Sequence, residues 1–370
     1  MKGMVILALM TLLHQGFSQE NTKLNYLFRS GSEGYECFRI PAIVSCTEGT
    51  LLAFAEGRKN GCSDTGNIDL VMKRSEDKGQ TWSTLIVIWD DGDNVCGNPA
   101  PVVDKNTGEV HLLLTWNLGE DHESEIIAGK SKDTRRIFHM NSQDQGKSWS
   151  EPLEITSAVK QSNWTWYATG PCHGIQLTKG ESAGRLLIPC DHIEAESKKY
   201  YSHCIYSDDH GKTWKLGQST LVDQVNECTV AELPDGKLVL NMRNYDRSQK
   251  TRKIAYSTDG GYSWGKLSSD PVLIEPICQA SSLSVFGEDG THTLYFLNPA
   301  HEKKRQKLTL RSSQDAGKSW SDFRILHEGP GAYTDLTLME NGKLGCLLEA
   351  GASSPYEGIV FMNLPLSPSP

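Results

Sequence analysis

The sequence lacks several features that would place it in common functional classes. After the first twenty residues, no stretch of this 370-residue chain approaches 18 consecutive apolar residues, so we expect no membrane span. There is no surplus of positive charge: the formal net charge is −9 and acidic and basic residues are interleaved, which argues against a surface for nucleic acid. None of the ten cysteines has C-x-x-C spacing, so we expect no zinc site.

The N-terminus has the pattern of an export signal. A lysine precedes an apolar run from Val5 to Leu13, and the small residues Gly16 and Ser18 occupy the −3 and −1 positions of a cleavage site. This pattern predicts a signal peptide over residues 1–18, with a buried N-terminal strand as the alternative. We therefore expect delivery through the secretory pathway, to the lysosome or the extracellular space. The sequon at Asn163 suits an exported protein, and some cysteines are expected to pair, although the pairing is left open.

One eight-residue pattern, S-x-D-x-G-x-x-W, occurs five times, ending at Trp82, Trp149, Trp214, Trp264 and Trp320. An aspartate two places before a glycine is typical of a turn, because the carboxylate accepts nearby backbone N–H groups and glycine tolerates a positive φ. The tryptophan adds a large ring that can pack against the body of the protein. Strand-like segments flank the copies, so each copy is expected to be a hairpin corner.

The spacing of these copies indicates the fold class. Successive tryptophans are 67, 65, 50 and 56 residues apart, a period with room for several short strands. No amphipathic helix of convincing length is present. The pattern predicts one all-β domain, residues 19–365, built as a propeller in which one blade can lack the repeat, followed by a tail at 366–370. Five equivalent carboxylates around a ring cannot meet at one point, so the repeats are interpreted as architecture.

Candidates for chemistry are unrepeated polar residues at strand ends. Arg39 interrupts the apolar segment "CFRIPAIV", where it could also lie along the surface. Arg58 and Asp64 lie in a polar loop that could be a solvated connection. Glu227 and Arg243 flank a short hairpin with the turn "PDGK", which could bring both charges to the same end.

Three more candidates lie in the C-terminal quarter of the chain. Arg311 ends an apolar strand just before the fifth repeat. Tyr333 follows a Gly/Pro loop, and Glu349 ends the apolar segment "LGCLLEAG". From the residues alone, each of these side chains could equally be an ordinary surface or core residue.

The segment "FRIP" followed by repeated S-x-D-x-G-x-x-W patterns resembles the exo-α-sialidases, or neuraminidases, of the bacterial and animal type, over nearly the whole chain. The resemblance implies a six-bladed β-propeller. It also implies hydrolysis of terminal α-linked sialic acid from glycoproteins, glycolipids such as gangliosides, or oligosaccharides, without a metal or organic cofactor.

The resemblance also assigns roles to the candidates. Arg39, Arg243 and Arg311 would bind the sugar's carboxylate, with Arg58 lining the pocket. Asp64 would be the acid/base, Glu227 the base for a nucleophilic Tyr333, and Glu349 would orient Arg39. Asn98, Asp121 and His122 are weaker candidates for the sugar's other arms. Cys172, in "YATGPCHGIQL", stands where the family has a glycine, so the pocket wall is expected to differ there.

These residue types suit the reaction. A guanidinium binds a carboxylate through paired N–H donors. A neutral phenol avoids the like-charge repulsion that an anionic nucleophile meets at a carbon bearing a carboxylate, and sialidases are a known exception to carboxylate nucleophiles. Three alternatives stay open: a binding propeller without hydrolysis, transfer of sialic acid to another sugar, and preference for a deaminated sialic acid.

Overall fold

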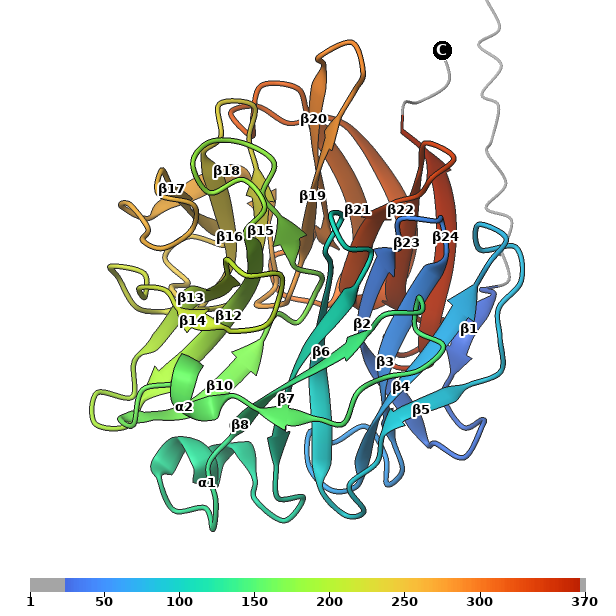
Figure 1. Cartoon of the computed structure of the whole chain (residues 1–370), viewed down its shortest axis with the longest axis vertical. Coiled ribbons are helices and arrows are strands. Elements are labelled where there is room, and N and C mark those ends of the chain that lie inside the picture. Colours follow the sequence, from blue (N-terminus) through green and yellow to red (C-terminus); the bar gives the residue numbers. More distant parts are fainter. Residues whose placement is uncertain (1–23, 367–370) are drawn as a thin grey trace, which may run out of the picture.

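The computed structural model in Figure 1 describes residues 24–366. Within this range the long elements are all strands, and two short helices, α1 (Glu123–Ala128) and α2 (Thr156–Val159), lie in connections. The all-β prediction is therefore confirmed. The predicted signal peptide, residues 1–18, and all but the first residue of the predicted tail lie outside the described residues. No helix in the described part is both long and apolar enough to span a bilayer.

The strands pair mainly with their chain neighbours, antiparallel, in six groups that we call meanders. The first two are β2 (Cys37–Ser45), β3 (Leu51–Arg58), β4 (Ile68–Ser75) and β5 (Ile86–Trp89), then β6 (Val95–Val103), β7 (Val110–Asn117), β8 (Arg136–Ser142) and β9 (Leu153–Glu154). The third comprises β10 (Trp164–Thr169), β11 (Ile175–Gln176), β12 (Leu186–Glu194), β13 (Tyr200–Ser207) and β14 (Lys215–Leu216). The fourth comprises β15 (Val225–Glu232), β16 (Leu238–Asn244), β17 (Thr251–Ser257) and β18 (Ser268–Ile274).

The last two meanders share one long strand. The fifth is β19 (Ser281–Phe286), β20 (His292–Pro299), β21 (Gln306–Ser313) and the first part of β22 (Ser321–Leu338). The second part of β22 pairs with β23 (Lys343–Ala350), which pairs with β24 (Gly358–Pro365), and β1 (Tyr26–Arg29) completes this sixth meander. The colours in Figure 1 run once around the molecule, so red β24 lies beside blue β1, and both ends of the described chain join the same sheet.

The repeats form the turns between the last two strands of the first five meanders, which agrees with the predicted hairpin corners. In the third copy, the Ser207 hydroxyl donates to Asp209 Oδ1 at 2.8 Å, the Gly211 N–H donates to Ser207 Oγ at 2.8 Å, and the Thr213 N–H donates to Asp209 Oδ1 at 2.9 Å. The other four copies make the same three bonds. Each copy therefore supplies the hydrogen bonds that stabilise its own turn.

The tryptophans of the repeats join neighbouring meanders. The Trp82 ring, from the first meander, lies 5.1 Å from the ring of Phe361 in β24 of the sixth. Trp320 Nε1 of the fifth meander donates to Asp270 Oδ2 in β18 of the fourth at 2.9 Å. The core is correspondingly divided into clusters between meanders, such as Leu52 and other residues of the first meander packed with apolar residues of the second.

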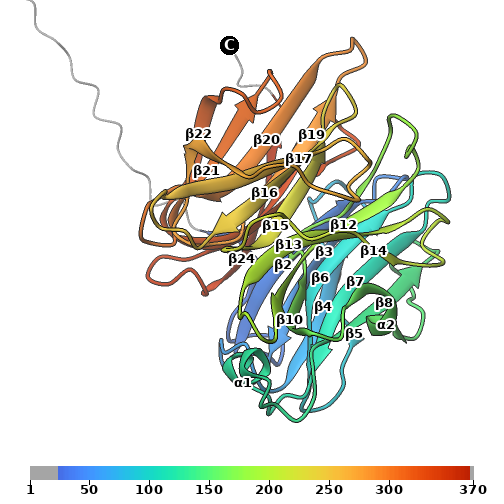
Figure 2. The same cartoon turned by 90° about the vertical axis from the view of Figure 1, so that its left-hand side faces the viewer.

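The first strand of five meanders has a shift in its pairing register, which marks a β-bulge. The shifts lie between Arg39 and Ala42, Gly97 and Ala100, Trp164 and Tyr167, Val225 and Cys228, and Gly331 and Thr334. A bulge adds an unpaired residue and changes the direction of nearby side chains. In the view turned by 90°, α1 lies beyond the end of β10, at one edge of the molecule (Figure 2).

Candidate active site

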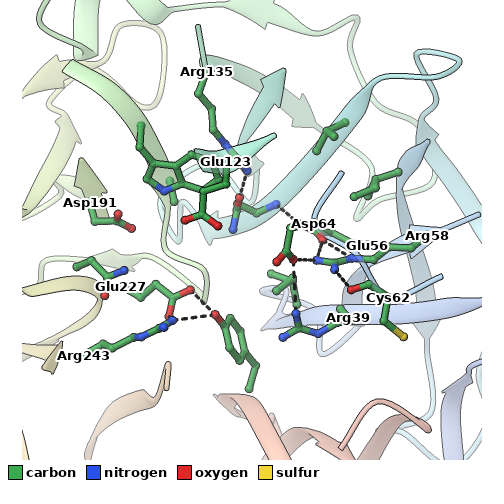
Figure 3. Close-up of a pocket in the computed structure, with 18 of the residues that line it drawn as sticks. Arg39, Glu56, Arg58, Cys62, Asp64, Glu123, Arg135, Asp191, Glu227 and Arg243 are labelled. Carbon is green, nitrogen blue, oxygen red and sulfur yellow. Dashed lines mark hydrogen bonds and ion pairs between the residues drawn. The ribbon is translucent and has the colours of Figure 1, made fainter. Parts of the chain in front are cut away.

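The bulged strands contribute residues to one pocket of about 260 Å³. This volume is slightly below the range of about 300–1,000 Å³ that is usual for small-molecule sites. Figure 3 shows its charged side chains directed toward one another. Arg39, Asn98, Trp166, Glu227 and Tyr333 all line it, and each lies within a shifted segment or at its edge. The bulges therefore supply side chains from separate meanders to the same small volume.

Tyr333 stands between a carboxylate and guanidinium groups. Its hydroxyl donates a hydrogen bond to Glu227 Oε1 and accepts one from Arg243 Nη1 at 3.2 Å. Arg243 Nη1 also donates to Glu227 Oε2 at 2.6 Å. Burial, and next the negative charge of Glu227, raise the pKa of Tyr333 well above its usual value, although the arginines act in the opposite sense. The phenol is therefore protonated and already hydrogen-bonded to a carboxylate that can serve as its base.

Two further guanidinium groups lie against the Tyr333 ring. The Cζ of Arg39 is 5.0 Å from the ring centroid, and that of Arg305 is 5.5 Å from it. Tyr356 holds both: Arg39 Cζ is 4.4 Å from the Tyr356 ring, and Arg305 Nη1 donates to the Tyr356 hydroxyl at 2.9 Å. Together with Arg243, three arginines from different meanders surround the phenol. Such a cluster is suited to bind an anion.

Glu349 fixes Arg39 from behind the pocket. Its Oε1 accepts from Arg39 Nε at 3.1 Å and from the Ile40 N–H at 2.9 Å, and its Oε2 accepts from Arg39 Nη2 at 3.3 Å and from the Tyr333 N–H at 3.1 Å. Glu349 is fully buried. Ile40 has a φ of 59°, a strained value for a β-branched residue. One carboxylate thus positions both the arginine and the tyrosine backbone.

Asp64 lies on the loop between β3 and β4, opposite Glu227 in the pocket (Figure 3). Its Oδ1 is 2.7 Å from Arg58 Nη2 and 3.5 Å from Arg39 Nη1, and just over half of the side chain is exposed. Burial acts to raise the pKa of Asp64, but the charges of Arg58 and Arg39 outweigh it and hold the pKa below its usual value. A disulfide from Cys62 on the same loop to Cys37 in β2 ties this loop down.

The expectation for Arg311 needs correction, because this residue does not line the pocket. It lies in β21, where its Nη1 donates to Asn298 Oδ1 at 3.3 Å. The third arginine of the pocket is Arg305, which directly precedes β21. A strand advances about 3.3 Å per residue, so Arg311 lies roughly 20 Å further along, at the end where the fifth repeat begins. The repeats and the pocket occupy opposite ends of the strands.

The weaker candidates from the sequence also include residues that line the pocket and residues that do not. Asn98 lines the pocket, but Asp121 and His122 do not: Asp121 accepts the N–H groups of Lys132 and Asp133, and His122 precedes α1. The adjacent Glu123 lines the pocket instead. Cys172 is fully buried, with its Sγ 3.6 Å from the Cys228 carbonyl oxygen, and is not part of the pocket wall.

Several lining residues were not expected from the sequence. The main ones are Glu56, Glu123, Arg135, Trp166, Asp191, Asn226, Tyr245, Arg305 and Tyr356. Glu56 pairs with Arg58 at 2.5 Å and accepts the Asn98 N–H at 2.8 Å. Counting from the repeats would have helped for Arg305, because the start of each third strand lies at the pocket end. The same count marks Arg135, which directly precedes β8, whereas no comparable signal marks Asp191.

Comparison with known proteins gives a consistent result. Residues 49–346 match the family model described as a BNR repeat-like domain. A sialidase of Micromonospora viridifaciens is 32% identical over 344 residues, which are 88% of this chain and 52% of that protein. An exo-α-sialidase of Aspergillus fumigatus is 31% identical over 365 residues, covering 90% and 85% of the two chains. Thus the chain spans about half the length of the first relative and most of the second.

Among solved structures, the Hadza microbial sialidase Hz136 superimposes with a TM-score of 0.83 at 29% identity. The match covers 92% of this chain and 68% of that one. The similarity therefore extends over nearly the whole chain.

Proposed function

The chain belongs to the sialidase family of glycoside hydrolases, and on this premise we propose that its pocket performs the exo-α-sialidase reaction with Tyr333 as the nucleophile. The observation that carries the proposal is the contact of the Tyr333 hydroxyl with Glu227 and Arg243, with Arg39 and Arg305 against the same ring. The substrates are sialylated glycoproteins, glycolipids such as gangliosides, or oligosaccharides, from which one terminal sugar is removed.

The arginines orient the substrate. Sialic acid carries a carboxylate on its anomeric carbon, C2, and Arg39, Arg243 and Arg305 are the guanidinium groups that surround the phenol. When they bind this carboxylate, C2 lies beside the Tyr333 oxygen. Paired N–H donors set the orientation of the carboxylate and also neutralise its charge. A lysine would neutralise the charge but would not set the orientation.

The first chemical step forms a bond between the Tyr333 oxygen and C2. Glu227 accepts the phenolic proton through the hydrogen bond already present, and the nearby guanidinium groups stabilise the negative charge that develops on the oxygen. At the same time the bond from C2 to the leaving oxygen breaks, and Asp64 gives that oxygen a proton. The product of this step is a tyrosyl-linked sugar.

The second step reverses these roles. A water molecule attacks C2 and gives its proton to Asp64, while the Tyr333 oxygen leaves and takes back the proton from Glu227. Two inversions at C2 give net retention. The charges of Arg58 and Arg39, which face Asp64, lower its pKa and favour its ionised form. A substrate carboxylate that binds Arg39 offsets part of this charge, so substrate binding itself favours the protonated Asp64 that the first step needs.

We further propose that the six meanders are the six blades of a closed propeller. The pairing of β1 with β24 and the packing of Trp82 on Phe361 support closure between the first and last parts of the chain. Export through the secretory pathway, to lysosome or extracellular space, is supported by the disulfide and by the exposed sequon at Asn163. The proposed domain limits remain 19–365.

The test uses a fluorogenic α-sialoside and the variant Tyr333→Phe, which removes only the hydroxyl. We expect the wild-type protein to release sialic acid with retention, followed by NMR, and the variant to lose several orders of magnitude in kcat with unchanged circular dichroism. Sialic acid release by the variant at a near wild-type rate would exclude Tyr333 as the nucleophile. Product transferred to an added sugar instead of water would identify a transferase.

A further inference from the structure

The three arginines around the phenol are not held in the same way. Arg39 and Arg243 each pair with a carboxylate, at 3.1 and 2.6 Å. Among the described residues, no carboxylate oxygen lies within 4.0 Å of the Arg305 nitrogens. Within the same part of the chain, its one side-chain hydrogen bond runs from Nη1 to the Tyr356 hydroxyl at 2.9 Å. The direction of Arg305 therefore depends on the position of Tyr356.

Tyr356 contacts two of the arginines and leaves their charges available. Arg39 Cζ lies 4.4 Å from the centroid of its ring, and its hydroxyl accepts the hydrogen bond from Arg305. Both contacts use partial charges, on the ring face and on the hydroxyl oxygen, so neither cancels a full positive charge as a carboxylate would. A tyrosine in this place can therefore fix the direction of two guanidinium groups without competing with an anionic substrate.

A short loop between β23 and β24 places Tyr356, and the next residue, Glu357, holds this loop together. Glu357 Oε1 accepts the Ser353 N–H and hydroxyl, both at 2.7 Å, and the Ser354 N–H at 3.2 Å. Its Oε2 accepts the Ala352 N–H at 3.1 Å. These bonds, that of the Ser353 N–H foremost, lower the pKa of Glu357 to about 2, so the group stays ionised in an acidic compartment. One carboxylate outside the pocket lining thus gathers four donors of the loop.

Ser30 connects the same loop to β2. Its hydroxyl donates to the Tyr356 carbonyl oxygen at 2.8 Å and accepts the Phe38 N–H at 3.2 Å, and its own N–H donates to the Glu357 carbonyl oxygen at 3.1 Å. Phe38 directly precedes Arg39 in β2. The backbone of the loop is therefore fixed relative to the strand that carries the first arginine, while the Glu357 side chain fixes the part of the loop that comes before Tyr356.

We propose that Glu357 is a positioning residue for substrate binding: it holds the loop that places Tyr356, and through the Tyr356 hydroxyl it directs Arg305 toward the sugar's carboxylate. This inference rests on the proposed function. Arg305 binds that carboxylate in the bound substrate and in the transition state alike. Its displacement should therefore weaken both states equally, which raises KM and leaves kcat almost unchanged.

The test measures kcat and KM of Glu357→Gln on a fluorogenic α-sialoside. Glutamine keeps the shape of the side chain but turns an NH₂ group toward donors of the loop, so we expect KM to rise about fivefold and kcat to stay within about twofold. Glu302→Gln is the matched control, because it breaks an exposed pair with Lys250 three residues before Arg305, and its KM should equal that of the wild type. An unchanged KM in Glu357→Gln, or a fall in kcat as large as the rise in KM, would overturn this inference and leave the sialidase reaction intact. If the wild-type protein does not cleave the sialoside, the proposed function fails and this inference fails with it.

A double variant separates positioning from a general effect on the fold. Tyr356→Phe keeps the ring against Arg39 but removes the acceptor for Arg305, so alone it should also raise KM about fivefold. If Glu357 acts through this hydroxyl, the double variant Glu357→Gln/Tyr356→Phe should have the KM of Tyr356→Phe within about twofold, whereas independent effects would multiply to about 25-fold. A multiplied effect would overturn the coupling. If Glu357→Gln does not fold, Ser353→Ala, which removes one hydroxyl that donates to Glu357, should raise KM about twofold, and an unchanged KM there would overturn the inference.

Discussion

Replacing Glu349 by glutamine should destabilise the protein far more than its conservative chemistry suggests. Four donors point at this fully buried carboxylate: two from Arg39 and the N–H groups of Ile40 and Tyr333. A glutamine keeps one oxygen, but its NH₂ group faces two of those donors. Two buried donors then lose their acceptor, at about 1–3 kcal/mol each, and the buried charge of Arg39 loses its closer carboxylate, which leaves Asp64 at 3.5 Å. Breaking such a pair costs about 3–5 kcal/mol.

The assay is equilibrium unfolding in urea, followed by tryptophan fluorescence and circular dichroism, with the loss read from the midpoint at unchanged slope. The matched control is Glu76→Gln, which breaks an exposed pair with Arg74 and should leave the midpoint almost unchanged. A loss below about 1 kcal/mol for Glu349→Gln would refute the reasoning. KM for a sialoside should also rise, since Arg39 is no longer held toward the pocket.

Three further predictions concern the arginines and the Asp64 loop. Arg305→Lys should raise KM about tenfold or more, because a lysine lacks the paired donors, whereas Arg311→Lys should leave KM unchanged; the opposite result would restore Arg311 to the pocket. Arg58→Met removes a positive charge beside Asp64, so the pKa of Asp64 rises. Because Asp64 must be protonated for the first step, the high-pH limb of the kcat/KM profile should move to higher pH. A shift to lower pH would contradict the assignment of Asp64 as the acid. Replacing both cysteines of the disulfide, which are 25 residues apart, by serine should cost about 3 kcal/mol of stability and lower kcat, measured by thermal unfolding and steady-state kinetics; an unchanged kcat would mean that the disulfide does not position the loop.

The all-β class was predictable because the repeats carry their own turn chemistry. The side chains of each copy bond within the copy, so the same local rules apply wherever it occurs. Arg39, Glu227 and Tyr333 stand out in the sequence as polar groups in or next to apolar strands, but only the resemblance to sialidases assigns them roles.

Arg305 and Arg135 were missed for a physical reason. Arg305 lies in the polar segment "HEKKRQ", which contains several basic residues that look alike in the sequence. Only the position where β21 begins determines which of them lines the pocket. Arg135 and Arg136 are adjacent and chemically identical, yet one is buried against Trp166 and the other is partly exposed. The disulfide was equally undetermined, because ten cysteines allow many pairings.

The bulges make the strands around the pocket unusually sensitive to length. In a regular strand, neighbouring side chains point to opposite faces, so removing one residue exchanges the two sets beyond that point. Deleting Ile40 or Asn98 would remove the bulge and its strained backbone, so the strand would pair in a regular register. The pocket-facing side chains beyond the deletion would then point into the packing between neighbouring sheets. Such a shortened protein should be inactive, although the hydrogen bonds between its strands are more regular. Activity therefore depends on the bulges in these strands.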